Sequence, residues 1–114
     1  MRSHIHFAVA LILISMPLQV KAVSDTCKTQ YPIVLVHGLN GFDTLAGNIM
    51  EYWHGIPQTL RSCGAVVYIA QVSPYHYAEV RGEQLLEQIA EIRVKTGAER
   101  VNVIGHSQGG IDAR

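Results

Sequence analysis

A serine set between two glycines is the part of this sequence best suited to covalent chemistry. The motif is Gly105-His106-Ser107-Gln108-Gly109, and it follows the apolar run VNVI. A strand before it and a helix start after it predict a sharp turn that lifts the serine hydroxyl clear of a sheet. The flanking glycines remove Cβ atoms that would collide in so tight a turn. We predict that Ser107 is a nucleophile; the alternative is a glycine turn without chemistry.

A second group of residues could stabilise the negative oxygen that forms when a serine attacks an ester. The backbone amide of Gln108 lies at a helix start, where amides lack partners and the dipole favours negative charge. Another donor would come from HGLNG, residues 37–41, because Gly38 and Gly41 allow the backbone to turn an amide inward. We predict an oxyanion hole made by the amides of Leu39 and Gln108, each worth about 3 to 4 kcal/mol.

Short strands and helices in alternation would position these groups. Apolar runs without alternation predict strands buried on both faces, and they occur in YPIVLVHG, AVVYIA and RVNVIG. Helices are predicted in IPQTLRSCG and over residues 79–96, closed by Gly97. The fold class is α/β, a parallel sheet with crossover helices and a nucleophile elbow. If the first and third strands are neighbours, both loops open into one crevice. The long helix carries an apolar stripe formed by Leu85, Ile89 and Ile92, with Leu86 beside them.

The chain divides into a leader and part of a domain. A secretory signal peptide is predicted at residues 1–22. It would consist of the positive Arg2, the apolar run from Phe7 to Met16, and the small residues Val20 and Ala22. An amphipathic first helix is the alternative. We interpret residues 23–114 as the N-terminal portion of a domain that stops just after the nucleophile elbow, because three parallel strands bury too little surface on their own.

Charge and cysteine content narrow the function. Without Arg2 and Lys21, seven basic residues remain against nine acidic ones. That balance argues against nucleic acid as a partner, since phosphate binding needs a clustered basic surface. Export would place Cys27 and Cys63 where a disulfide can persist, and two independent thiols are the alternative.

Five segments in order resemble a known family. YPIVLVHGLNGFDTLAG, YWHGIP, AVVYIAQVS, EVRGEQLLEQI and VNVIGHSQGG are similar to the secreted bacterial true lipases of family I, foldase-dependent triacylglycerol lipases with an α/β-hydrolase fold. The resemblance runs from Tyr31 to Gly110 and implies that Ser107 is the nucleophile and that the Leu39 and Gln108 amides form the oxyanion hole. Asn40 departs from the pattern, as does the segment NIMEYWH.

The resemblance also sets expectations for what lies outside this sequence. It implies a lid, a calcium site, a triad acid and a catalytic histidine, all downstream of the elbow, and no metal or other cofactor within this segment. The family's disulfide lies downstream too, so the resemblance implies nothing about Cys27 and Cys63. A steric foldase and a lipid–water interface are the implied partners.

The expected function is a secreted serine lipase, exported through the periplasm, that hydrolyses acylglycerol esters through an acyl-enzyme on Ser107. The segment alone would be inactive because it lacks the triad acid and base. A carboxylesterase, thioesterase or acyltransferase of the same fold is the alternative, as is a non-catalytic secreted fragment. A phosphate or dinucleotide binder is disfavoured, because neither a GxGxxG nor a P-loop pattern is present.

The histidines receive structural interpretations. His106 would point away from Ser107 and pack beneath the sheet. His37 would hold the oxyanion loop by hydrogen bonding. His54 and His76 are predicted to be surface residues.

The charged residues near the motifs are interpreted in the same way. Asp112 would point away from any catalytic imidazole. Arg81 is expected to form surface or helix-end ion pairs with Glu83 and Glu87. Asp43 is expected to cap its loop.

Overall fold

The computed structural model describes residues 24–39 and 52–114. The predicted signal peptide, Asn40, Asp43 and residues 48–51 lie outside these ranges, so the expectations about them stay predictions. No helix in the described ranges is long and apolar enough to cross a membrane.

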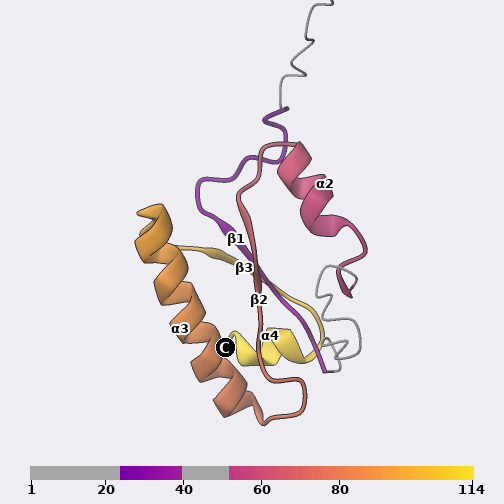
Figure 1. Ribbon diagram of the computed structural model, residues 1–114, viewed down its shortest axis with the longest axis vertical. Helices are drawn as coiled ribbons and strands as arrows, with labels where there is room; N and C mark the ends of the chain where they lie inside the picture. The colour runs from indigo at the N-terminus through magenta and orange to yellow at the C-terminus, as the bar shows by residue number, and fades with distance from the viewer. Residues whose placement is uncertain (1–23, 40–51) are drawn as a thin grey trace, which may run out of the picture.

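Strands and helices alternate along the described chain, as the sequence predicts (Figure 1). The strands form one parallel sheet in the order β2-β1-β3. The α/β class and the neighbouring positions of the first and third strands are therefore confirmed. The elements are β1 (Ile33–Val36), α2 (Ile56–Ser62), β2 (Val67–Ala70), α3 (Ala78–Thr96), β3 (Asn102–Gly105) and α4 (Gln108–Asp112).

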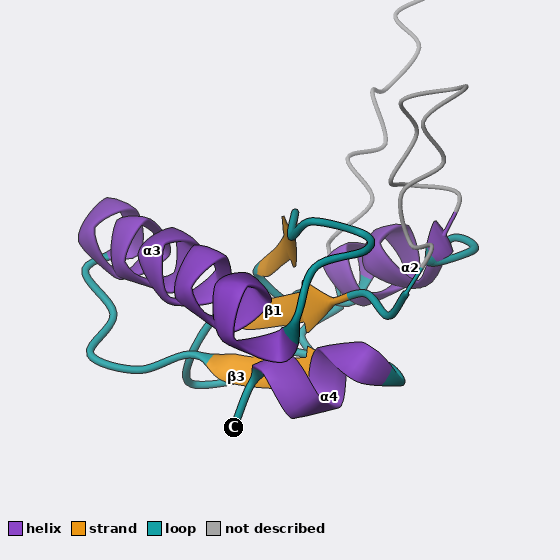
Figure 2. Cartoon of the chain, turned by 90° about the horizontal axis from the view of Figure 1, so that it is seen from below, coloured by secondary structure: helices purple, strands orange, loops and turns teal. Residues whose placement is uncertain are grey.

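The central strand β1 is buried on both faces. Successive side chains point to opposite sides of the sheet, and an apolar cluster covers each side. Val34 and Val36 pack with Leu85 and Ile92 of α3 in one apolar cluster. Ile33 and Leu35 face a second cluster that includes Trp53, Ala65 and Val67, with Leu60 of α2 packed against it. Figure 2 shows α3 and α2 on opposite sides of the sheet. A strand covered twice needs the uninterrupted apolar run that IVLV provides.

The helix ends follow the sequence signals. Pro57 stands in the first turn of α2, where its missing N–H costs no hydrogen bond. Gly97 ends α3 in the left-handed conformation, with φ of 69°, which a residue without a Cβ adopts readily. The long helix starts at Ala78, one residue before the predicted start.

One burial prediction is wrong. All four residues of β3 are exposed, whereas the sequence predicts a buried strand. The physical reason is its place at the edge of the sheet, where β1 is its only strand partner among the described residues. Leu86 of α3 is 67% exposed, although Leu85 beside it is buried. Consecutive residues of a helix face different directions, and Leu86 lies off the stripe that meets the sheet.

A disulfide joins the start of the described chain to the end of α2. Cys27 and Cys63 are bonded, with their Cα atoms 5.0 Å apart, and the backbone amide of Cys27 donates to the Cys63 carbonyl at 2.8 Å. The disulfide expected from export is therefore formed. It fixes the segment that leads into β1 against the helix covering one face of the sheet.

Removing this disulfide should lower stability without changing the fold. In the full-length protein, Cys27→Ser with Cys63→Ser should lower the free energy of unfolding by about 3 to 4 kcal/mol, because the crosslink restricts a 36-residue loop in the unfolded chain. Urea denaturation measures the difference. Two free thiols in the unreduced wild-type protein, detected by mass spectrometry, would contradict the expectation.

Candidate active site at the carboxyl ends of the strands

The loops that follow β1 and β3 lie side by side. Strand register pairs Val36 with Gly105, and the His106 amide donates to the Val36 carbonyl at 2.9 Å. Both strands run in the same direction, so the segments after them leave the sheet at the same end, the carboxyl end of the strands. The described part of HGLNG, residues 37–39, and the motif GHSQG therefore meet at this end of the sheet.

Ser107 occupies a backbone conformation that non-glycine residues rarely adopt. Its φ and ψ are 54° and −124°, between the end of β3 and the first residue of α4. Such a conformation costs about 1 to 3 kcal/mol and is found mainly where function requires it. The turn is closed by the Gly109 amide donating to the His106 carbonyl and the Gly110 amide donating to the Ser107 carbonyl, both at 3.0 Å. The Ser107 residue is exposed, which its predicted role as a nucleophile requires.

The flanking glycines allow the backbone to pack this closely. A Cβ on Gly105 would lie 2.5 Å from the Gly110 nitrogen, and one on Gly109 would collide with the carbonyl oxygens of Val36 and His37. Backbone atoms cannot move aside as a flexible side chain can. The prediction that these glycines remove colliding Cβ atoms is therefore confirmed.

The described part of the predicted oxyanion loop, residues 37–39, contacts the predicted nucleophile elbow directly. A Cβ built on Gly38 would lie 2.9 Å from the Ser107 Cβ and 3.1 Å from the His106 carbonyl oxygen. Only a glycine lets the two segments come this close. Leu39 follows immediately, and its side chain is 52% exposed at the same end of the sheet.

Hydrogen bonds fix the direction of the peptide unit that contains the Leu39 amide. His37 Nδ1 donates to the Gly38 carbonyl at 2.9 Å, and His37 itself is fully buried. The described chain contains no cis peptide bond, so the C=O and N–H of one peptide unit point in opposite directions. The Gly38 carbonyl faces the buried imidazole, and the Leu39 N–H therefore points away from it. The Gln108 amide, at the start of α4, has no acceptor among the described residues.

A buried arginine connects the oxyanion loop to the elbow helix. Arg81 of α3 is fully buried and forms an ion pair with Asp112 of α4 at 2.7 Å. Its guanidinium also donates to the Ser73 carbonyl at 2.6 Å and to the His37 carbonyl at 2.9 Å, with a longer contact to Gly38 at 3.4 Å. One side chain thus links the three segments that follow β1, β2 and β3.

The expectation for Arg81 is therefore wrong. Arg81 forms no surface ion pair with Glu83 or Glu87 but a buried one with Asp112, 31 residues further along the chain. Asp112 is occupied by this arginine and also accepts from the Gln108 side chain at 3.3 Å. These bonds fit the prediction that Asp112 does not orient a catalytic imidazole.

Two glutamines of α3 form hydrogen bonds with backbone groups of the segment that follows β2. Gln88 exchanges hydrogen bonds with both the amide and the carbonyl of Gln71. Gln84 accepts from the Ser73 amide and donates to its hydroxyl. The third segment at this end of the sheet is therefore held by side chains of the long helix, none of which the sequence interpretation singled out.

The histidine predictions have different outcomes. His37 supports its loop as predicted, with Nδ1 on the Gly38 carbonyl and Nε2 near the Val72 amide at 3.4 Å. His54 and His76 are exposed, as predicted. His106 does not pack beneath the sheet. It is exposed, and its Nδ1 is hydrogen-bonded to the hydroxyl of Tyr52.

Tyr52 is the site residue that sequence reasoning missed. Its hydroxyl accepts from the Gly38 amide at 3.0 Å and contacts His106 Nδ1. No local spacing rule connects a tyrosine to loops that lie 14 and 54 residues away. The only sequence signal is its place in YWHGIP, a segment quoted for resemblance alone.

No metal centre is found in the described ranges. Residues 24–39 and 52–114 contain no group of three or more His, Cys, Asp or Glu side chains arranged to hold a metal ion. The calcium site implied by the resemblance stays a prediction about other parts of the protein.

Comparison with known proteins agrees with this geometry. The family model described as the alpha/beta hydrolase fold matches residues 31–113. The chain belongs to the α/β-hydrolase family. The matched region of this α/β-hydrolase includes β1, the oxyanion loop, Arg81 and the nucleophile elbow.

Several relatives of this α/β-hydrolase are bacterial lipases. It is 63% identical to a triacylglycerol lipase of Vibrio cholerae over 83 residues, 73% of this chain and 26% of the relative. It is 50% identical to one of Pseudomonas fragi over 92 residues, 81% of this chain and 31% of the relative. It is 45% identical to one of Burkholderia plantarii over 111 residues, 94% of this chain and 30% of the relative. The chain spans about a quarter to a third of the length of these relatives.

Adjacent glycines of α4 should tolerate alanine very differently. In the full-length α/β-hydrolase, Gly109→Ala should cause loss of folded protein or of several kcal/mol of stability, because the new methyl group meets the backbone of Val36 and His37. Gly110→Ala is the matched control. Its Cβ would lie 3.8 Å from the nearest carbonyl oxygen, and alanine favours a helix by up to about 1 kcal/mol. Thermal unfolding compares the two, and equal tolerance would contradict the close packing.

Loss of the buried arginine should destabilise the full-length protein strongly. Arg81→Met leaves Asp112 buried without its partner and should cost about 3 to 5 kcal/mol. Arg93→Met, at an exposed position of the same helix, should change stability by less than about 0.5 kcal/mol. Adding Asp112→Leu to Arg81→Met should restore part of the loss, as measured by urea denaturation. An Arg81→Met protein as stable as the Arg93→Met control would contradict the role of the ion pair.

Proposed function

We propose that the full-length protein is a secreted serine lipase that hydrolyses acylglycerol esters through an acyl-enzyme on Ser107. The observation that carries the proposal is the exposed Ser107 in a turn of positive φ, in contact with Gly38 of the adjoining loop. A strained serine at a strand-to-helix turn is the geometry in which a nucleophile elbow presents its hydroxyl.

The chemistry begins with attack of the Ser107 hydroxyl oxygen on the ester carbonyl carbon. The carbonyl oxygen then carries negative charge, which the amides of Leu39 and Gln108 stabilise. Support for this pair comes from the direction of the Leu39 N–H, set by the Gly38 carbonyl, and from the free Gln108 amide within the described ranges. A general base takes the Ser107 proton and delivers it to the ester oxygen as the bond from that oxygen to the acyl carbon breaks, so the alcohol leaves and the acyl group stays on Ser107. Water then releases the fatty acid and restores the serine hydroxyl.

A general base and an acid must complete this mechanism. In the described ranges no histidine is hydrogen-bonded to the Ser107 hydroxyl, and His37 and His106 have other partners. We assign the catalytic histidine and the triad acid to residues outside these ranges. Residues 23–114 alone are then inactive, because an unassisted serine is a weak nucleophile.

The relatives and the surface of the site support the proposed substrate class. The three relatives named above are triacylglycerol lipases. Leu39 directly follows Gly38 and is exposed, so its apolar surface would be available to an acyl chain. We further propose secretion through the periplasm, action at a lipid–water interface, and folding assisted by a steric foldase.

The proposal is tested with the full-length protein and its Ser107→Ala variant. The wild type should be labelled by a fluorophosphonate and should hydrolyse emulsified triglyceride, whereas Ser107→Ala should not be labelled and should lose more than about a thousandfold in kcat. Residues 23–114 should show no turnover of a p-nitrophenyl ester above the same variant of that segment.

The outcomes separate the alternatives. Activity on soluble short esters without activity on emulsified triglyceride would indicate a carboxylesterase. Labelling without ester hydrolysis would favour a thioesterase or acyltransferase. A full-length protein that the fluorophosphonate does not label would be a non-catalytic protein, and the proposal would be wrong.

A further inference from the structure

We propose that Tyr52 is a positioning residue whose hydroxyl holds the oxyanion loop in register with the nucleophile elbow. The inference rests on the proposed ester hydrolysis at Ser107. It adds a residue that precedes α2 and that belongs to neither of the two loops.

The Tyr52 side chain lies between the two segments that carry the proposed amide donors. Its ring makes edge-on contacts with the His37 and His106 rings, each with centroids 5.8 Å apart. His37 belongs to the segment before Leu39, and His106 directly precedes Ser107. The hydroxyl accepts from the Gly38 amide at 3.0 Å and is hydrogen-bonded to His106 Nδ1. A single oxygen atom thus joins both loops.

The contact with Gly38 acts on the peptide unit just before the one that supplies the Leu39 donor. In the unit formed by the His37 carbonyl and the Gly38 amide, Arg81 donates to the carbonyl at 2.9 Å and Tyr52 accepts from the amide at 3.0 Å. The two side chains therefore hold opposite ends of one trans peptide unit. The next unit is held by His37 through the Gly38 carbonyl. Together these bonds set the direction of the Leu39 N–H before any substrate arrives.

The contact with His106 acts on the elbow. His106 lies two residues before Gln108, and its backbone is tied to β1 by the bond from its amide to the Val36 carbonyl. An ideal Cβ on Gly38 would lie 3.2 Å from the Tyr52 hydroxyl and 2.9 Å from the Ser107 Cβ, so both side chains lie close to this glycine. Loss of the hydroxyl should loosen the spacing between the Leu39 and Gln108 amides. Preorganised donors act on the transition state more than on substrate binding.

A purely structural role would look different. The Tyr52 ring also packs edge-on against Trp53, with centroids 5.3 Å apart, and joins the apolar cluster on the α2 face. Phenylalanine keeps this packing and removes only the hydroxyl. Tyr52→Phe therefore isolates the two hydrogen bonds from the contribution of the ring.

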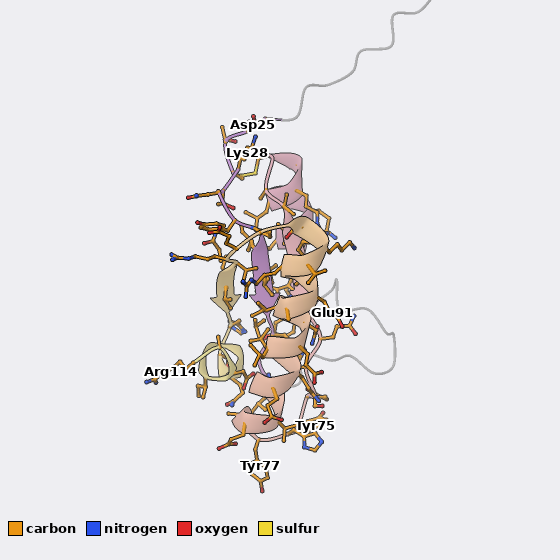
Figure 3. All side chains as sticks on the ribbon, turned by 90° about the vertical axis from the view of Figure 1, so that its left-hand side faces the viewer. Asp25, Lys28, Tyr75, Tyr77, Glu91 and Arg114 are labelled. Atoms are coloured by element: carbon orange, nitrogen blue, oxygen red, sulfur yellow. A yellow bond between two sulfur atoms is a disulfide. The ribbon has the colours of Figure 1, made fainter. Side chains whose placement is uncertain are left out.

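The test compares Tyr52→Phe with a matched control in the full-length protein. Tyr75→Phe removes a hydroxyl from a residue that is 77% exposed in the loop between β2 and α3. Figure 3 shows Tyr75 and Tyr77 at the end of the molecule where this loop turns. Tyr52→Phe should lower kcat by about threefold to tenfold, as expected for loss of one neutral hydrogen bond, with KM changed less than about twofold. The rate of fluorophosphonate labelling should fall by a similar factor. Tyr75→Phe should match the wild type.

A second readout does not depend on activity. In protein labelled with ¹⁵N at histidine and glycine, Tyr52→Phe should shift the ring resonances of His106 and the amide of Gly38, and Tyr75→Phe should not. A His106 ring without a hydrogen bond to Tyr52 in the wild type would overturn the inference, even if Tyr52→Phe failed to fold.

The results separate this inference from the function beneath it. If the wild type is labelled and Tyr52→Phe behaves like Tyr75→Phe, the positioning role is wrong and the proposed function stands. A rise in KM with unchanged kcat would also overturn the role, because it would indicate substrate binding. If the wild type is not labelled, the proposed function fails and the positioning role fails with it.

Discussion

The buried ion pair between Arg81 and Asp112 is the interaction on which the geometry of the site depends. A guanidinium removed from water is costly unless its donors are satisfied, and here they meet one carboxylate and the backbone carbonyls of two loops. A buried charge without these partners would cost more than a buried carbonyl without one. The segments after β1 and β2 and the helix after the elbow are therefore drawn together around one side chain. Arg81 is buried, whereas the Ser107 turn is exposed at the surface.

Much of the fold was predictable because it rests on local chemistry. The run IVLV has no alternation because β1 is covered on both faces, and that is visible in four residues. Pro57 and Gly97 mark helix ends through backbone conformation alone. Glycines on both sides of Ser107 indicate that backbone segments approach closely there, because a Cβ at Gly105 or Gly109 would collide with backbone atoms. Patterns of this kind need no knowledge of distant contacts.

The errors and omissions share a physical cause, since each depends on residues far apart in the chain. Arg81 has acidic neighbours at helical spacing, and local rules assign it to them, yet its partner is on α4. The prediction that His106 packs beneath the sheet rests on consecutive residues pointing apart at a sharp turn, but Tyr52, 54 residues earlier in the chain, is hydrogen-bonded to its exposed ring. The exposure of β3 depends on its being the last strand of the described sheet, which its own apolar residues do not reveal.

The outer side of β3 has a consequence for the segment when it is handled alone. Within the described ranges this strand is hydrogen-bonded to β1 on one side, and Val103 and Ile104 are 38% and 46% exposed. The unpaired backbone N–H and C=O groups of such an edge strand can pair with a strand of another molecule, including an identical one. When residues 24–114 are handled alone, the outer side of β3 is therefore where two copies would be expected to pair.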